Sequence, residues 1–254
     1  MADKDYRSDH NKNALLHPEH PKLIVLEGID LSGRTTQVQL LQDWLVAQRY
    51  HVTTTAWRTS PLVSDILTRA RTGPPLQPLT YSLLFCADHM DRTQHVIRPA
   101  LEGGEIVLAD RYTYTAFARD AARGLDRSWV RNLYRFSAQP DIVFYLHIPP
   151  EEAVKRRMAL QQHRENSLKA ASKKNGKDAR HDKGRSKTGT LMLSTPLSHE
   201  ALESFRNFEI KMYSEYQEMQ KEFGFSVIEG NQSIDTIQAA LRRAITRSLL
   251  EMDS

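Results

Sequence analysis

The stretch Lys22–Thr36, KLIVLEGIDLSGRTT, decides the fold of this chain. It begins with a continuous apolar run, Leu23–Leu26, which is typical of a strand buried on both faces. A loop bounded by Gly28 and Gly33 follows, and Arg34-Thr35-Thr36 then opens a helical pattern. This order matches the P-loop, Gly-x-x-x-x-Gly-Lys-[Ser/Thr], except that arginine replaces the lysine. We therefore expect a strand, a phosphate-binding loop and a helix in succession.

The loop predicts a polyphosphate site. Glycines let backbone N–H groups turn inward around phosphates without interference from a Cβ atom. The N-terminus of the following helix adds partial positive charge. Arg34 keeps the charge of the usual lysine but is a larger planar group, so nucleotide binding is better supported than turnover. The expected phosphate-binding residues are Gly28, Ile29, Asp30, Leu31, Ser32, Gly33, Arg34, Thr35 and Thr36.

The composition indicates one cytoplasmic α/β domain. The chain has 254 residues, 40% apolar and 26% charged, which is ordinary for a globular protein with a sizeable core. A single cysteine, Cys86, excludes a disulfide framework and a cysteine-rich zinc site and suits a reducing compartment. No apolar run approaches the ~20 residues of a membrane span. Residues 1–21 are polar, so we expect a disordered tail rather than a signal peptide.

The basic charge is concentrated in one segment. Residues 161–190 contain nine basic and three acidic side chains, a net charge of +6 in a chain whose total is +4. The remainder is therefore nearly neutral, and a nucleic-acid-binding surface spread over the fold is not expected. Low apolar content from Gln161 to about Pro196 predicts a mobile segment.

Strand and helix patterns alternate along the rest of the chain. Apolar or β-branched runs predict four further strands, at 52–57, 106–109, 141–148 and 225–228. Helical patterns cover 38–49, 62–71, 80–102, 129–136, a segment opened by Pro149-Pro150, a long segment through 205–223, and 234–249. This alternation favours a parallel five-stranded sheet with right-handed crossovers, formed by residues 22–254.

Four pieces of sequence, the P-loop among them, carry a family resemblance. They are LEGIDLSGRTTQ at 26–37, LLFCADH at 83–89, VIRPALEGGEIVLADRY at 96–112 and ARGL at 122–125. In this order and at this spacing they resemble the thymidylate kinases. The resemblance implies the P-loop nucleoside monophosphate kinase fold, with a mobile LID over the active site and a homodimeric assembly. The LID position corresponds here to a basic insertion at about 156–200.

The resemblance also implies catalytic roles. Thr35 and Asp110 would hold Mg²⁺, and the acid stands at the end of a strand, where α/β folds place ligands. Arg111 would contact the transferring or acceptor phosphate through two hydrogen bonds. LID arginines would stabilise charge on the transferred phosphoryl group once the LID closes. The implied catalytic residues are Arg34, Arg111, Arg156 and Arg157, and Arg164 lies within the same LID segment.

The acceptor pocket departs from the family pattern. His89 stands where the family carries an arginine that reads the thymine edge, and imidazole is shorter and usually neutral near pH 7. Arg119 and Asp120 stand where the family has tyrosine and glutamine. The resemblance implies that Asp30 accepts a hydrogen bond from the 3′-hydroxyl of the acceptor, that Arg58 holds the acceptor phosphate and that Phe85 stacks on the base. The implied substrate-binding residues are Asp30, Arg58, Phe85, His89, Arg111 and Arg119.

The sequence favours an enzyme that transfers the γ-phosphoryl group of ATP to a nucleoside monophosphate with Mg²⁺, and dTMP is the first candidate acceptor. Two alternatives stay open. The changes at His89, Arg119 and Asp120 favour a nucleoside kinase or a kinase for another monophosphate. The change at Arg34 favours a non-catalytic nucleotide-binding module, or an adaptor whose basic insertion contacts RNA or an acidic partner.

Overall fold

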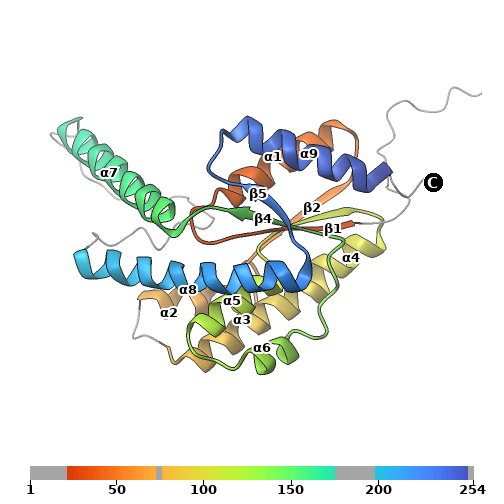
Figure 1. Cartoon of the computed structure of the whole chain (residues 1–254), viewed down its shortest axis with the longest axis horizontal. Helices are drawn as coiled ribbons and strands as arrows, with labels where there is room; N and C mark the ends of the chain where they lie inside the picture. The colour runs from red at the N-terminus through yellow and green to blue at the C-terminus, as the bar shows by residue number, and fades with distance from the viewer. Residues whose placement is uncertain (1–21, 73–75, 175–197, 251–254) are drawn as a thin grey trace, which may run out of the picture.

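A parallel sheet of five strands forms the centre of the molecule (Figure 1). The computed structural model describes residues 22–72, 76–174 and 198–250. The strands are β1 (Lys22–Glu27), β2 (Val52–Ala56), β3 (Ile106–Asp110), β4 (Ile142–His147) and β5 (Ser226–Glu229), in the order β2-β3-β1-β4-β5. The predicted α/β class and parallel sheet are therefore confirmed. The predicted tail, residues 1–21, lies outside the described residues.

Helices cover both faces of this sheet (Figure 1). They are α1 (Arg34–Ala47), α2 (Ser64–Thr72), α3 (Pro78–Arg92), the π-helical turn η1 (Thr93–Ile97), α4 (Arg98–Glu102), α5 (Thr113–Ala122), α6 (Arg127–Leu133), α7 (Pro150–Lys174), α8 (His199–Phe223) and α9 (Ile234–Leu250). Helices α1 and α9 lie on one face, whereas α3, α5 and α8 lie on the other. Helix α7 extends away from the sheet.

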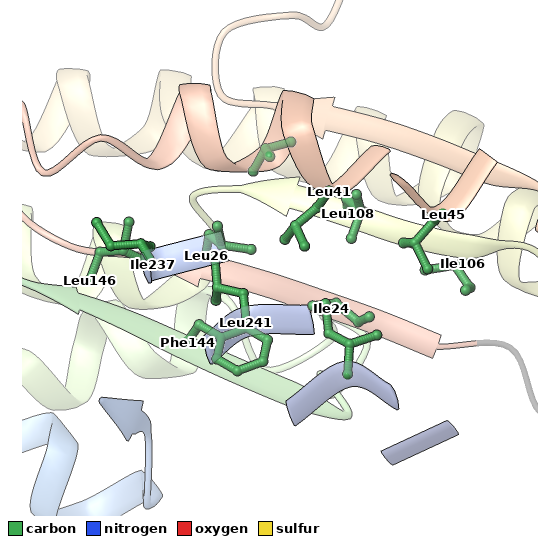
Figure 2. Close-up of a cluster of buried hydrophobic side chains, with 12 residues drawn as sticks. Ile24, Leu26, Leu41, Leu45, Ile106, Leu108, Phe144, Leu146, Ile237 and Leu241 are labelled. Atoms are coloured by element: carbon green, nitrogen blue, oxygen red, sulfur yellow. The ribbon is translucent and has the colours of Figure 1, made fainter. Parts of the chain in front are cut away.

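Side chains of β1 alternate between two cores, because successive residues of a strand point to opposite faces. Ile24 and Leu26 pack with apolar side chains of α1 and α9 (Figure 2). Leu23 and Val25 pack in a cluster with η1 and α4 on the other face. Every residue of β1 is buried, which the apolar run predicts for Leu23–Leu26.

The parallel register brings the carboxyl ends of the central strands to one edge. Leu26 of β1 and Ala56 of β2 both pair with Asp110 of β3, and Glu27 pairs with Tyr145 of β4. The segments that follow β1, β2 and β3 therefore begin side by side. They contain the P-loop (Gly28–Thr36), Arg58 and Arg111, respectively.

The predicted helix over 80–102 is helical throughout but is not an uninterrupted α-helix. Between α3 and α4, Arg98 N–H donates to Thr93 O, five residues back, which defines the π turn. Pro99 has no N–H to give His95 O, the acceptor that an α-helix would assign to it. A wider turn before the proline accommodates that missing bond.

Two helices differ in extent from what the sequence indicated. The segment from Gln161 was expected to be mobile, yet α7 is helical through Lys174. Its Ala, Leu, Gln, Glu, Lys and Arg residues are good helix formers, and a solvated helix does not need a wide apolar face. Residues 175–197 lie outside the described residues. Phe136 was expected on a helix with Trp129, but α6 ends at Leu133 and Phe136 is 61% exposed.

Candidate active site

The P-loop has the backbone that its glycines predict. Gly28 has φ +149°, and a Cβ there would lie 2.7 Å from Leu146 O and 2.8 Å from Ser32 Oγ. Gly33 has φ +98° and is the N-cap of α1. Leu31 between them also has a positive φ, +64°, which is rare for a residue with a side chain. The loop therefore holds the tight conformation of a phosphate cradle.

Arg34 is buried and bonded to the loop itself. Its Nη1 donates to Gly28 O at 2.5 Å, to Ile29 O at 2.7 Å and to Ser32 Oγ at 2.9 Å. Its Nε donates to Asp110 Oδ1 at 3.1 Å. Nη2 has no hydrogen bond within the part of the chain that the structure describes. A lysine has one nitrogen and cannot make this set of contacts, so Arg34 links the P-loop to the end of β3.

Thr35 and Asp110 form a pair of oxygen ligands suited to Mg²⁺. Thr35 Oγ1 donates to Asp110 Oδ2 at 2.5 Å, so a hydroxyl and a carboxylate meet beside the phosphate cradle. Mg²⁺ favours oxygen ligands and is usually held by one or two protein groups together with substrate phosphates and water. No group of three or more His, Cys, Asp or Glu side chains in the described segments is placed to hold a metal alone. The donor set fits a metal shared with a nucleotide.

Arg111 and Asp30 form an ion pair across the cradle. Arg111 has φ +74°, and its guanidinium bonds Asp30 Oδ1 through Nη2 and Thr115 Oγ1 through Nη1. Burial acts to lower the pKa of Arg111, but the charge of Asp30 leads a set of neighbours that raise it above its usual value. Arg111 therefore stays charged, and its side chain is held at the mouth of the loop.

Glu27 is a site residue that the sequence argument missed. It is fully buried and accepts hydrogen bonds from Tyr112 N–H at 2.8 Å, Thr115 Oγ1 at 2.5 Å and Tyr216 OH at 2.7 Å. Burial raises its pKa. Glu27 thus ties β1 to α5 and α8. The signal in the sequence that could have found it is a carboxylate directly after a buried apolar run, because a charge buried there needs partners.

Glu209 of α8 is the second missed residue. It is 1% exposed, and its Oε2 accepts a hydrogen bond from the backbone N–H of Asp30 at 3.0 Å. Burial first, and then the negative charge of Asp30, raise its pKa to about 8. In the sequence, Glu209 lies in phase with Phe205, Met212 and Tyr216, so helical periodicity placed a carboxylate on the buried face.

The residues implied to bind the acceptor differ in their surroundings. Arg58 follows β2 with φ +67° and lies at the same edge as the P-loop. Phe85 is buried against Trp57, and the Arg119 guanidinium lies 4.1 Å from the Phe85 ring centroid. Arg119 is itself paired with Asp120 through two hydrogen bonds, at 2.6 and 2.8 Å. The ring expected to stack on a base is therefore covered by a guanidinium.

His89 is enclosed in the protein. It is fully buried, its Nε2 lies 2.7 Å from Ser137 Oγ, and its ring packs against Tyr112 and Tyr134. Burial, and then the cation of Arg92, lower the pKa of His89 to about 3, so the imidazole is neutral. His89 supports the packing between α3 and the segment after α6 in this structure.

The two implied LID arginines sit at the base of α7. Arg156 donates to Glu152 Oε1 at 2.9 Å, to Leu31 O at 3.1 Å and to Gly230 O at 3.0 Å. It therefore anchors α7 to the P-loop. The Arg157 guanidinium lies 5.3 Å from the Phe205 ring, and burial lowers its pKa. Arg164 lies further along α7.

Comparisons with known proteins agree with this geometry. The family model for thymidylate kinase matches residues 26–205. A probable thymidylate kinase 2 of Saccharolobus solfataricus is 33% identical over 224 residues, which cover 88% of this chain and 94% of that protein. A probable thymidylate kinase of Thermococcus kodakarensis is 37% identical over 142 residues, or 52% of this chain and 69% of that protein. A thymidylate kinase of Brachyspira hyodysenteriae is 36% identical over 138 residues, or 54% and 68%. Within the described residues, no helix is long and apolar enough to cross a membrane.

Proposed function

Because the chain belongs to the thymidylate kinase family, we propose that it transfers the γ-phosphoryl group of ATP to dTMP, with Mg²⁺ bound at Thr35 and Asp110. The observation that carries the proposal is the meeting of three functional groups at one edge of the sheet. These are the phosphate cradle after β1, the Thr35–Asp110 oxygen pair and the Arg111–Asp30 ion pair. Together they provide a donor site, a metal site and a cationic group beside both.

The chain's residues act by positioning and by neutralising charge. The amides of the P-loop and the N-terminus of α1 bind the donor phosphates. An oxygen of the acceptor phosphate attacks the γ-phosphorus, and the bond from that phosphorus to the bridging oxygen of ADP breaks. Arg111 stabilises the negative charge that spreads over the transferred group. Mg²⁺, when bound, neutralises charge on the donor phosphates.

A coupled ADP-release assay tests this function. Acceptors would be dTMP, dUMP, other nucleoside monophosphates and thymidine, each with ATP and Mg²⁺. We expect turnover with dTMP and none with thymidine, because the acceptor atom is a phosphate oxygen. Asp110→Asn should lower the rate by roughly 10²-fold, since it removes a charge that the reacting centre uses. The absence of acceptor-dependent ADP release would contradict the proposal.

The acceptor series also resolves the base preference. The Arg119 guanidinium over Phe85 gives the pocket a buried cation where the family carries tyrosine. A monophosphate that outperforms dTMP in kcat/KM would show that this change has altered the substrate. ATP binding without turnover on any acceptor would favour the non-catalytic nucleotide-binding module.

A further inference from the structure

The loop after β2 carries an arginine whose backbone, rather than its side chain, is fixed by the protein. Arg58 has φ +67°, a left-handed conformation that residues with a Cβ rarely adopt. Its guanidinium makes no hydrogen bond or ion pair with any of the described residues. Arg34, Arg111 and Arg119, by contrast, are each bonded through their guanidinium groups. What sets the direction of the Arg58 side chain is therefore the conformation of its own backbone.

Asp88 of α3 is hydrogen-bonded to the backbone around Arg58. Its Oδ2 accepts a hydrogen bond from Arg58 N–H at 3.0 Å, and its Oδ1 accepts one from Ser60 N–H at 3.0 Å. One carboxylate thus holds two amides on either side of Thr59. Asp88 is fully buried, so both bonds are shielded from water, which strengthens them.

Arg92 completes the arrangement. Its Nε donates to Asp88 Oδ2 at 3.0 Å, and its Nη1 donates to Thr55 Oγ1 at 2.9 Å. Arg92 is 1% exposed and lies one helical turn after Asp88. The ion pair gives the buried carboxylate a cationic partner, and the bond to Thr55 ties α3 to β2, the strand that leads to Arg58.

We propose that Asp88 is a positioning residue, which holds the backbone of Arg58 in its left-handed conformation and thereby aims the free guanidinium at the acceptor phosphate. The proposal rests on the proposed function, since that function gives Arg58 its phosphate. Strained backbone persists only where surrounding contacts fix it, and such sites cluster where ligands bind. If the φ angle of Arg58 relaxed to an ordinary value, its Cβ would point elsewhere and a long side chain would be carried away from its target.

The first test is Asp88→Asn in the full chain, which keeps the size of the side chain but gives one of its two positions an NH₂ group that cannot accept a hydrogen bond. Steady-state rates with varied dTMP at saturating ATP, and calorimetric Kd values for dTMP and thymidine, are the measurements. We expect KM and Kd for dTMP to rise about tenfold or more, since small displacements of a binding group have effects of this size. The KM for ATP and the affinity for thymidine, which lacks the phosphate, should not change.

A double-variant cycle separates positioning from simple stability. Arg58→Gly removes the guanidinium and accepts φ +67° without strain. In the Arg58→Gly background, Asp88→Asn should weaken dTMP binding no further, although it should still lower Tm. The matched control is Asp141→Asn. Asp141 Oδ2 also accepts a backbone amide, Leu23 N–H at 2.7 Å, but at the start of β4, so this variant should lower Tm and leave dTMP affinity unchanged.

Each outcome is decisive. Unchanged dTMP affinity in folded Asp88→Asn protein overturns the proposal, as does an equal loss of affinity with and without Arg58. If Arg58→Gly alone leaves KM and Kd for dTMP unchanged while turnover persists, Arg58 holds no phosphate, and the positioning role is wrong although the phosphotransferase is right. If no acceptor is turned over, the proposed function fails, and the calorimetric cycle with dTMP still decides whether Asp88 acts through Arg58.

Discussion

At the scale of single residues, Arg34 differs from the usual P-loop lysine in what it contacts. Nε bonds Asp110, Nη1 bonds two carbonyls and a hydroxyl of the loop, and Nη2 makes no hydrogen bond with the described residues. Arg34 therefore supports the metal-binding carboxylate as well as the loop. These contacts fit the guanidinium of an arginine. They are the reason to expect an active kinase whose site accommodates arginine (an adapted enzyme), rather than a kinase that has lost its activity.

The first prediction concerns variants of Arg34. Arg34→Met should lower kcat on the order of 10²-fold or more, because it removes a group that meets developing charge. Arg34→Lys should lower activity or leave it level, because an ammonium group cannot bond Asp110 and the loop together. Steady-state ADP release at saturating ATP and dTMP is the measurement. A wild-type rate of ADP release equal to that of Arg34→Met, or a higher rate in Arg34→Lys, would contradict the interpretation as an adapted enzyme.

The second prediction concerns Glu209, whose pKa is raised to about 8 in the folded protein from an ordinary value near 4.5. The folded state then holds a proton that the unfolded state releases, so this contribution to stability is complete below about pH 4.5 and is lost as pH rises toward 8. Glu209→Gln mimics the protonated form and should remove the loss. Relative to wild type, its free energy of unfolding should rise between pH 5 and 8 by at least about 1.4 kcal/mol, the value of one pKa unit. The free energy of unfolding would be measured by denaturant titration at each pH. If it varied with pH in the same way for wild type and Glu209→Gln, the raised pKa of Glu209 would be refuted.

At the scale of elements, the sequence predicted strands and their edge better than helix extent. An unbroken apolar run marks β1, and Asp110 at the end of β3 falls beside the P-loop because parallel strands share one carboxyl edge. Helix α5 was not predicted, although Tyr114, Phe117 and Ala118 recur at helical spacing. The partners of Glu209 and Asp88 are far apart in sequence, so pattern alone could not identify them.

The third prediction concerns the P-loop as an element. ATP with Mg²⁺ should raise Tm, because it binds the folded state. Gly28→Ala should remove this shift, since its Cβ would lie 2.7 Å from a backbone oxygen that cannot move freely. Gly33→Ala, with no described atom within 4 Å of its Cβ, suffers only the strain of φ +98° and should retain part of the shift. Gly33→Val should remove the rise in Tm. An unmoved melting curve for wild type at saturating ATP would mean that the loop binds no nucleotide.

At the scale of the whole molecule, hydrogen bonds connect the P-loop and the strand before it to three helices, α5, α7 and α8. Glu27 joins the strand before the loop to α5 and α8, and Glu209 joins the loop itself to α8. Arg156 joins it to α7, whose base lies against the loop. Helices α7 and α8 are therefore both connected to the cradle by hydrogen bonds. A movement of α7 or α8 would change the geometry of the loop.

The last prediction concerns assembly, for which family membership implies a homodimer. Leu79 and Leu83 lie one turn apart on α3 and are 49% and 47% exposed, so α3 presents an apolar face to solvent. A second copy of the chain that packs on this face would bury both side chains and gain their transfer free energy. Sedimentation equilibrium should therefore show a dimer, and Leu83→Lys should raise its Kd at least about tenfold, the effect of ~1.4 kcal/mol. Val46→Lys is the matched control, because Val46 is equally exposed but lies on α1, across the sheet. A monomeric wild type at tens of micromolar, or equal weakening by both variants, would show that α3 is not the interface.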